Sequence, residues 1–174
     1  MLNIEEVKKL IVDVPNFPKE GIIFKDITPI FQHPDVLNKI IEQMAEITSQ
    51  IDFDVIVAPE SRGYLFAVPL ALKTNKPFVF VRKKGKLPRE TISITYTLEY
   101  NTTEIEIQKS DILPNQKILI IDDLLATGGT IAATIELIEK LGGIVVGTAF
   151  LVELKDLNGR DKIKGYDILA LMEY

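Results

Sequence analysis

The chain has 174 residues, 47% of them apolar and 26% charged, with a net charge of −5 and no cysteine. This length suits one domain with a substantial core, and the negative charge gives no global basic field for binding nucleic acid. The absence of cysteine excludes disulfides, thiolate catalysis and cysteine-ligated metals, and the single histidine, His33, argues against a histidine triad or zinc site. Because the N-terminus lacks a signal-peptide core and no apolar run approaches the roughly 20 residues that span a bilayer, we expect a cytoplasmic protein without membrane or nucleic-acid partners.

The first fifty residues predict two helices separated by an irregular segment. Asn3 followed by Glu6 fits a capping box, and apolar residues at helical spacing continue to Ile11. Two prolines then end this helix, and residues 19–31 look irregular or briefly extended. A second amphipathic helix fits residues 34–49.

Beyond residue 50 the chain alternates short apolar runs with helical patterns. The runs are nearly continuous, which suits strands buried on both faces, as in a parallel sheet. Helical patterns at about 63–74 and 129–142 separate them, so we predict an α/β fold with a parallel core sheet flanked by helices. The runs are Val55–Ala58, Phe78–Val81, Ile118–Ile121 and Ile144–Leu151, and Ile168–Met172 could add a final strand.

One stretch, residues 91–108, breaks this rhythm. Apolar and polar residues alternate from Ile92 to Tyr100, and the alternation resumes at Ile105 and Ile107 after a polar turn. This pattern predicts a two-stranded ribbon inserted into the α/β frame. Such a ribbon is a candidate lid over a ligand site.

The most informative segment joins the apolar run at 118–121 to the helix that begins near 129. Asp122 and Asp123 follow the run directly, and a loop rich in glycine and threonine comes next. The carboxyl end of a strand is where ligands bind in open α/β sheets, and the helix N-terminus behind the loop suits a phosphate. The two carboxylates stand where they would accept hydrogen bonds from a ribose and stabilise positive charge on its ring. The alternative is a plain turn and helix cap, which an Asp pair beside four apolar residues disfavours.

This segment resembles the signature of the type I phosphoribosyltransferases for 5-phosphoribosyl 1-pyrophosphate (PRPP), in which two acidic residues precede Ala-Thr-Gly-Gly-Thr. Over nearly its whole length the chain is similar to the adenine phosphoribosyltransferases of that family, an enzyme group of purine salvage. The stretches that carry the resemblance are 17–29, 61–66, 82–88, 96–100, 104–108 and 151–154.

The resemblance implies a type I phosphoribosyltransferase fold and a pentosyl transfer that converts adenine and PRPP into AMP and pyrophosphate. It implies Mg²⁺ as cofactor, held mainly by PRPP with no direct protein ligand, and a homodimer. The whole chain, 1–174, would form one domain, with residues 1–34 as an N-terminal hood and 91–108 as a flexible lid.

The resemblance also assigns roles to particular residues. A cis peptide bond is expected between Glu60 and Ser61, and Glu99 is expected to act as acid/base catalyst beside the adenine ring. The expected ligands of the ribose and 5′-phosphate are Asp122, Asp123, Ala126, Thr127, Gly128, Gly129 and Thr130. Those of pyrophosphate are Arg62, Arg82, Lys83 and Lys86, partly through the neighbouring subunit, and those of adenine are Ile22, Ile23, Phe24 and Arg62.

The residues alone leave several alternatives open. A run of charges, or a lone Glu on the polar face of a strand, is usually solvated, and Ile and Phe usually lie in a core. The same fold acting on hypoxanthine, guanine or xanthine is one rival, which the sequence Leu98-Glu99-Tyr100 disfavours. A purine-sensing regulator is another, but the segment before the hood is too short for a DNA-binding domain, and the negative charge disfavours DNA.

Overall fold

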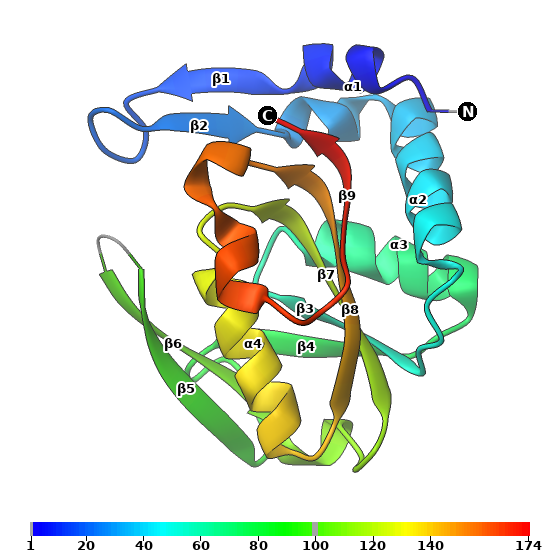
Figure 1. Ribbon diagram of the computed structural model, residues 1–174, viewed down its shortest axis with the longest axis vertical. Coiled ribbons are helices and arrows are strands. Elements are labelled where there is room, and N and C mark those ends of the chain that lie inside the picture. Colours follow the sequence, from blue (N-terminus) through cyan, green and yellow to red (C-terminus); the bar gives the residue numbers. More distant parts are fainter. Residues whose placement is uncertain (1, 99–100) are drawn as a thin grey trace.

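The computed structural model of the protein describes residues 2–98 and 101–174, and its centre is a seven-stranded sheet (Figure 1). The strand order is β5–β6–β4–β3–β7–β8–β9, and the five strands from β4 to β9 in this order run parallel. The predicted α/β fold with a parallel core is therefore confirmed. The parallel strands are β3 (Val55–Pro59), β4 (Phe78–Lys83), β7 (Lys117–Leu125), β8 (Ile144–Glu153) and β9 (Ile168–Glu173).

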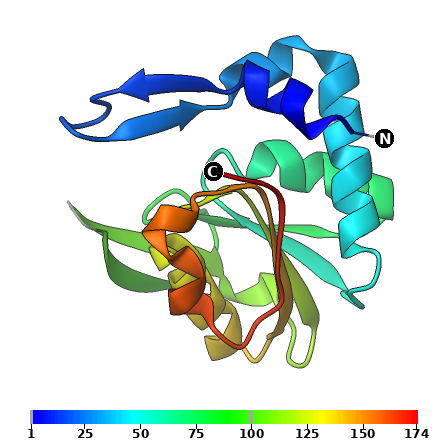
Figure 2. The same cartoon turned by 45° about the horizontal axis from the view of Figure 1, so that its top comes forward.

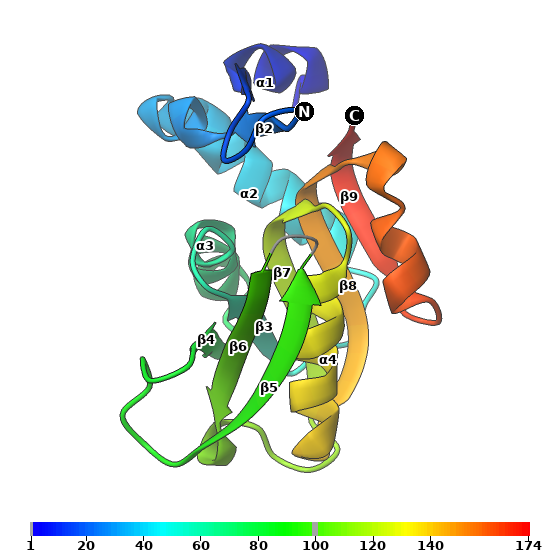
Figure 3. The ribbon, with the colours of Figure 1, turned by 90° about the vertical axis from the view of Figure 1, so that its left-hand side faces the viewer.

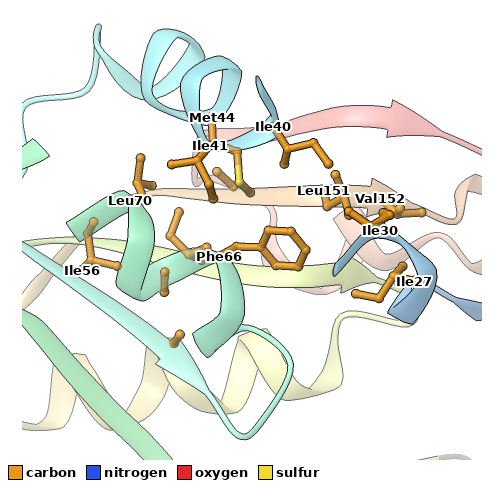
Figure 4. Close-up of a cluster of buried hydrophobic side chains, with 14 of the residues drawn as sticks. Ile27, Ile30, Ile40, Ile41, Met44, Ile56, Phe66, Leu70, Leu151 and Val152 are labelled. Atoms are coloured by element: carbon orange, nitrogen blue, oxygen red, sulfur yellow. The ribbon is translucent and has the colours of Figure 1, made fainter. Parts of the chain in front are cut away.

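Helices cover both faces of this sheet, as Figure 3 shows. The helices α2 (Pro34–Thr48) and α3 (Tyr64–Thr74) pack on one face, and α4 (Gly129–Lys140) packs on the other. Within β3, Ile56 lies in the cluster beneath α2 and α3, whereas Val57 lies in the cluster beneath α4. The apolar runs are continuous because both faces of each central strand are buried. Figure 4 shows the first cluster, with the Phe66 ring between helical and strand side chains.

The predicted ribbon is present, and it continues the main sheet at its β4 edge. Strands β5 (Thr91–Leu98) and β6 (Asn101–Gln108) pair antiparallel, and β6 also pairs antiparallel with β4. The apolar face of the ribbon explains this placement, since Ile94, Ile105 and Ile107 are buried in the cluster that α4 covers. The ribbon is thus anchored against α4 along its apolar face.

The N-terminal segment differs from the sequence-based prediction. Helix α1 (Ile4–Leu10) begins as expected, with the Asn3 side chain accepting the N–H groups of Glu5 and Glu6. The chain then forms a strand, β1 (Val12–Pro15), that pairs antiparallel with β2 (Ile23–Asp26). Only the brief extension within 19–31 was expected. Figure 2 shows this hairpin as a separate layer above the sheet, near the C-terminus.

Short 3₁₀ turns complete the chain, and no periodic pattern of residues predicted them. They are η1 (Thr28–Gln32), η2 (Lys109–Asp111), η3 (Lys155–Leu157) and η4 (Gly159–Ile163). Strand β7 also runs four residues past its predicted end, so that Asp122 and Asp123 are strand residues. Among the helices of the described residues, none is long and apolar enough to span a membrane.

Candidate active site

A cavity of about 430 Å³ opens at the carboxyl ends of β3 and β7, beneath the N-terminal hairpin. It brings together Phe24 of β2, residues 60–62 after β3, and residues 122–131, which run from β7 into α4. All seven residues predicted to hold the ribose and 5′-phosphate line this one cavity. Its place at the strand ends is the usual ligand site of parallel α/β sheets.

The two aspartates form the charged floor of the cavity. Asp123 is buried, and its backbone N–H donates to Oδ1 of Asp122 over 2.9 Å. Burial, with the neighbouring Asp123 carboxylate, raises the pKa of Asp122 well above its ordinary value. Hydroxyl donors would favour the ionised form of Asp122, so the pair is suited to accept hydrogen bonds from a diol.

Close packing fixes where Asp122 lies. A Cβ atom added to Gly63, the N-cap residue of α3, would stand 2.7 Å from Oδ1 of Asp122. Gly63 has φ −55°, an ordinary helical value, so glycine is needed here for space alone. The start of α3 and the end of β7 therefore touch at the carboxylate.

The loop from Ala126 to Gly128 leads into α4 and is supported from below by Gly159. Gly128 has φ +78°, and a Cβ on it would overlap the carbonyl of Gly159, while a Cβ on Gly159 would overlap the carbonyl of Ala126. Gly128 caps α4 without a side-chain hydrogen bond to the first turn. The N–H groups of that turn are thus suited to an anion.

The loop after β3 brings one arginine to the cavity. The Glu60–Ser61 peptide bond is cis, as predicted. Nε of Arg62 lies 2.9 Å from Oδ2 of Asp123 in an ion pair, and its guanidinium carbon lies 5.0 Å from the centroid of the Phe24 ring. Arg62 therefore links the loop, the aspartate pair and the N-terminal hairpin.

The basic segment at the end of β4 reaches the site only indirectly. Nε of Arg82 and the N–H of Lys83 both donate to Oε2 of Glu60 over 3.1 Å, and Nη1 of Arg82 donates to the carbonyl of Lys86. Arg82, Lys83 and Lys86 do not line the cavity, and the last two are exposed. Their binding of pyrophosphate stays a prediction.

A second, more apolar cavity of about 830 Å³ shares Ala126 and Thr127 with the first. The predicted adenine residues divide between the two, with Ile22 and Ile23 in the second and Phe24 in the first. Sequence reasoning assigned no role to the other residues that line the second cavity. One of these, Leu154, directly follows strand β8 at the sheet edge where ligands bind. The missed residues are Gly21, Lys25, Leu154, Asp156, Leu157 and Tyr174.

Two further predictions concern catalysis and metal. Glu99 lies outside the described residues. Across 2–98 and 101–174, no three His, Asp or Glu side chains gather in a way that could hold a metal ion. The aspartate pair nevertheless fits Mg²⁺, which usually takes one or two carboxylates together with substrate oxygens.

Comparisons with known proteins agree with this geometry. Residues 26–170 match the phosphoribosyl transferase domain family. The chain is 54% identical over 170 residues to an adenine phosphoribosyltransferase of Lachnoclostridium phytofermentans, with 98% of each chain covered.

Two solved structures are also similar. The adenine phosphoribosyltransferase of Thermoanaerobacter pseudethanolicus superposes with a TM-score of 0.96 at 50% identity, covering 99% of this chain and 100% of the other. The enzyme of Saccharomyces cerevisiae, in complex with an imino-altritol bisphosphate and adenine, gives a TM-score of 0.87 at 41% identity, covering 94% and 95%.

Proposed function

The chain belongs to the adenine phosphoribosyltransferases of the phosphoribosyltransferase family, and we propose that it transfers the 5-phosphoribosyl group of PRPP to adenine, giving AMP and pyrophosphate. The observation that carries the proposal is the cavity in which an aspartate pair stands beside an uncapped helix N-terminus, next to a second, apolar cavity. One cavity suits a charged sugar phosphate, and the other suits a flat base.

The loop and first turn of α4 hold the 5′-phosphate. Their N–H groups and the hydroxyls of Thr127 and Thr130 supply the hydrogen-bond donors that a phosphate needs. These donors lie at the positive end of the helix dipole. Asp122 and Asp123 accept the ribose hydroxyls. As pyrophosphate leaves C1′, the same carboxylates stabilise the positive charge that develops on the ring.

The leaving pyrophosphate needs cations. Arg62 lies at the cavity, where its guanidinium is paired with Asp123. It would bind the leaving group by exchanging this carboxylate for pyrophosphate oxygens. Arg82, Lys83 and Lys86 would supply the remaining positive charge for the pyrophosphate. They would do so either within one subunit, held by Glu60 directly or through Arg82, or from a second subunit. Asp122 and Asp123 are the residues that would lie beside a Mg²⁺ ion held mainly by PRPP, and such an ion would supply positive charge for the leaving group.

The second cavity suits the adenine ring. Ile22 and Ile23 form one wall and Leu154 and Leu157 another, while Phe24 borders the sugar site. Glu99 would hold or move a proton on the purine as N9 attacks C1′. Glu99→Gln should therefore lower kcat about 10²-fold with little change in PRPP affinity, and an unchanged kcat would refute this role for Glu99.

A homodimer is the assembly we propose, through an apolar face on α3 and β4. Leu65, Val68 and Leu72 lie at helical spacing on α3 with 45%, 38% and 79% of their surfaces exposed, and Phe80 on β4 is 42% exposed. A patch of this kind on a helix and the neighbouring strand favours burial against a second copy. In this assembly β4, which contains Arg82, would lie near the partner.

The mass in solution tests this assembly. Leu72→Glu should give a monomer in light scattering, whereas Leu113→Glu, which changes an equally apolar side chain that is 60% exposed elsewhere, should leave the dimer intact. A monomeric wild-type protein with full activity would refute the dimer. The hood at 1–34, the lid at 91–108 and the cytoplasmic location stay predictions from the sequence.

The ribose assignment has a direct test. Replacing Asp122 by Asn and Asp123 by Ala together should abolish AMP formation, while circular dichroism shows a folded protein. Turnover within a factor of about ten of the wild-type rate, roughly 1.4 kcal/mol of barrier, would show that the aspartates do not stabilise the transition state.

A further inference from the structure

Tyr96 makes a hydrogen bond that neither the sequence nor the proposed mechanism assigned. Its phenol oxygen lies 3.1 Å from Oγ1 of Thr130, and either atom could donate. Tyr96 belongs to β5 of the ribbon, whereas Thr130 lies in the first turn of α4 and lines the phosphate cavity. This contact therefore joins the ribbon to the phosphate site.

The direction of this hydrogen bond decides what Thr130 can offer a ligand. A hydroxyl has one proton, so a Thr130 that donates to Tyr96 has none left for a phosphate oxygen. Once an anion occupies the cavity, the favourable arrangement is Tyr96 donating to Thr130 and Thr130 donating to the anion. Each bond in such a chain polarises and strengthens the next.

The composition of the cavity makes this donor matter. Among the described residues that line it, Arg62 is the only cation, and it is paired with Asp123. The segment from Ala126 to Ile131 contributes no charged side chain, so a phosphate there depends on N–H groups and on the hydroxyls of Thr127 and Thr130.

The surroundings of Tyr96 leave it able to donate. The ring is half-buried against the cluster beneath α4, which restricts the rotation of the side chain. Burial also raises the pKa of Tyr96, so the phenol keeps its proton throughout the neutral range.

We propose that Tyr96 is a positioning residue that directs the Thr130 hydroxyl toward the 5′-phosphate of PRPP and thereby ties the ribbon to an occupied phosphate site. This inference rests on the proposed function. It concerns substrate binding through Thr130, and Tyr96 itself does not touch the reacting atoms.

Tyr96→Phe tests the inference because it removes the hydroxyl and keeps the ring. We expect the KM for PRPP to rise five- to tenfold, with kcat and the KM for adenine within twofold of wild type. Tyr166→Phe is the matched control, since the Tyr166 phenol donates to Glu139 on the same helix over 2.6 Å, away from the cavity. It should leave both KM values unchanged.

A double-mutant cycle separates action through Thr130 from ring packing. If Tyr96 acts through Thr130, Tyr96→Phe adds nothing to the loss of PRPP affinity that Thr130→Ala causes. In the Thr130→Ser background, which keeps the hydroxyl, Tyr96→Phe still lowers PRPP affinity. Additive losses, or an unchanged KM for PRPP in Tyr96→Phe, would overturn the inference. If Tyr96→Phe does not fold, equal PRPP affinities of Thr130→Ser and Thr130→Ala, measured by calorimetry, would overturn it, and tighter binding by Thr130→Ser would support it.

Assays of the wild-type protein separate a failure of this inference from a failure of the proposed function. Wild-type turnover of adenine and PRPP with an unaffected Tyr96→Phe variant rejects only the role of Tyr96. A wild-type protein that neither binds nor consumes PRPP rejects the proposed function and this inference with it.

Discussion

Gly63→Ala changes one atom at the contact between helix α3 and the aspartate pair. The added Cβ would stand 2.7 Å from Oδ1 of Asp122, 3.0 Å from the carbonyl oxygen of Ile121 and 3.2 Å from that of Pro59. Two of these neighbours are backbone atoms of β3 and β7, which cannot move without disturbing the sheet. The Asp122 carboxylate can move, so we expect it to take most of the displacement.

The magnitude follows from the overlap. Ordinary contact begins near 3.4 Å, so the carboxylate must retreat by about 0.7 Å. Overpacking of this kind costs about 1–3 kcal/mol. The reduced freedom of the unfolded chain returns about 0.4–1 kcal/mol, because Gly63 has an ordinary helical φ. The net loss of stability is therefore about 0–2.6 kcal/mol, so Tm should fall by at most about 10 °C.

The loss of activity should exceed the loss of stability. A displacement of 1 Å at a catalytic group can cost about 10²-fold in rate, so kcat/KM for PRPP should fall at least tenfold. Gly147→Ala, in β8, is the matched control. Its added Cβ would lie 2.8 Å from Cδ1 of Ile51, a similar distance, but this neighbour is the end of a flexible side chain. It should lower Tm without lowering kcat/KM. Wild-type kcat/KM in folded Gly63→Ala would refute the contact argument.

Three further perturbations test the support around the site. Arg160→Met leaves the buried Glu153 carboxylate without its two hydrogen bonds of 2.6 and 2.7 Å. The stability lost should be about 1–3 kcal/mol, so Tm in calorimetry should fall by about 2–12 °C, and an unchanged Tm would refute this. The raised pKa of Asp122 means that the ligand-free protein loses stability as pH rises from about 3.8 through the raised value. Asp122→Asn should therefore have a higher Tm than wild type at pH 7 and a Tm that depends less on pH, whereas a lower Tm would contradict the pKa direction. Glu106→Ala removes the buried acceptor of the Lys86 and Leu87 N–H groups, so their amide hydrogen exchange should accelerate; unchanged rates would show that other contacts hold this loop.

The sequence was informative wherever local pattern and burial agree. The run Ile118–Ile121 is fully buried on both faces, so composition alone indicated a central parallel strand. The residues after it were equally readable, because a phosphate loop needs glycine, hydroxyls and a helix start in immediate succession. These features occupy adjacent positions, and no distant partner is needed to recognise them.

Pairing between distant segments was not readable in the same way. Val12–Pro15 forms a strand because it pairs with Ile23–Asp26. Nothing in the four residues of this strand predicts that pairing. The ribbon joined β4 for a similar reason, since Ile107 of β6 pairs with Val81 of β4 although strand β5 lies between them in the sequence. Tyr174 reaches the second cavity only because β9 ends there, and a terminal tyrosine carries no signal of its own.

The most direct test of the account is a comparison of purine bases. The protein is incubated with Mg²⁺ and PRPP together with adenine, hypoxanthine, guanine or xanthine, and the nucleotide and pyrophosphate formed are quantified. The account predicts AMP and pyrophosphate in equal amounts from adenine, at a far higher kcat/KM than any product from the other bases. Formation of no nucleotide, or faster formation of a nucleotide from another base, would contradict it.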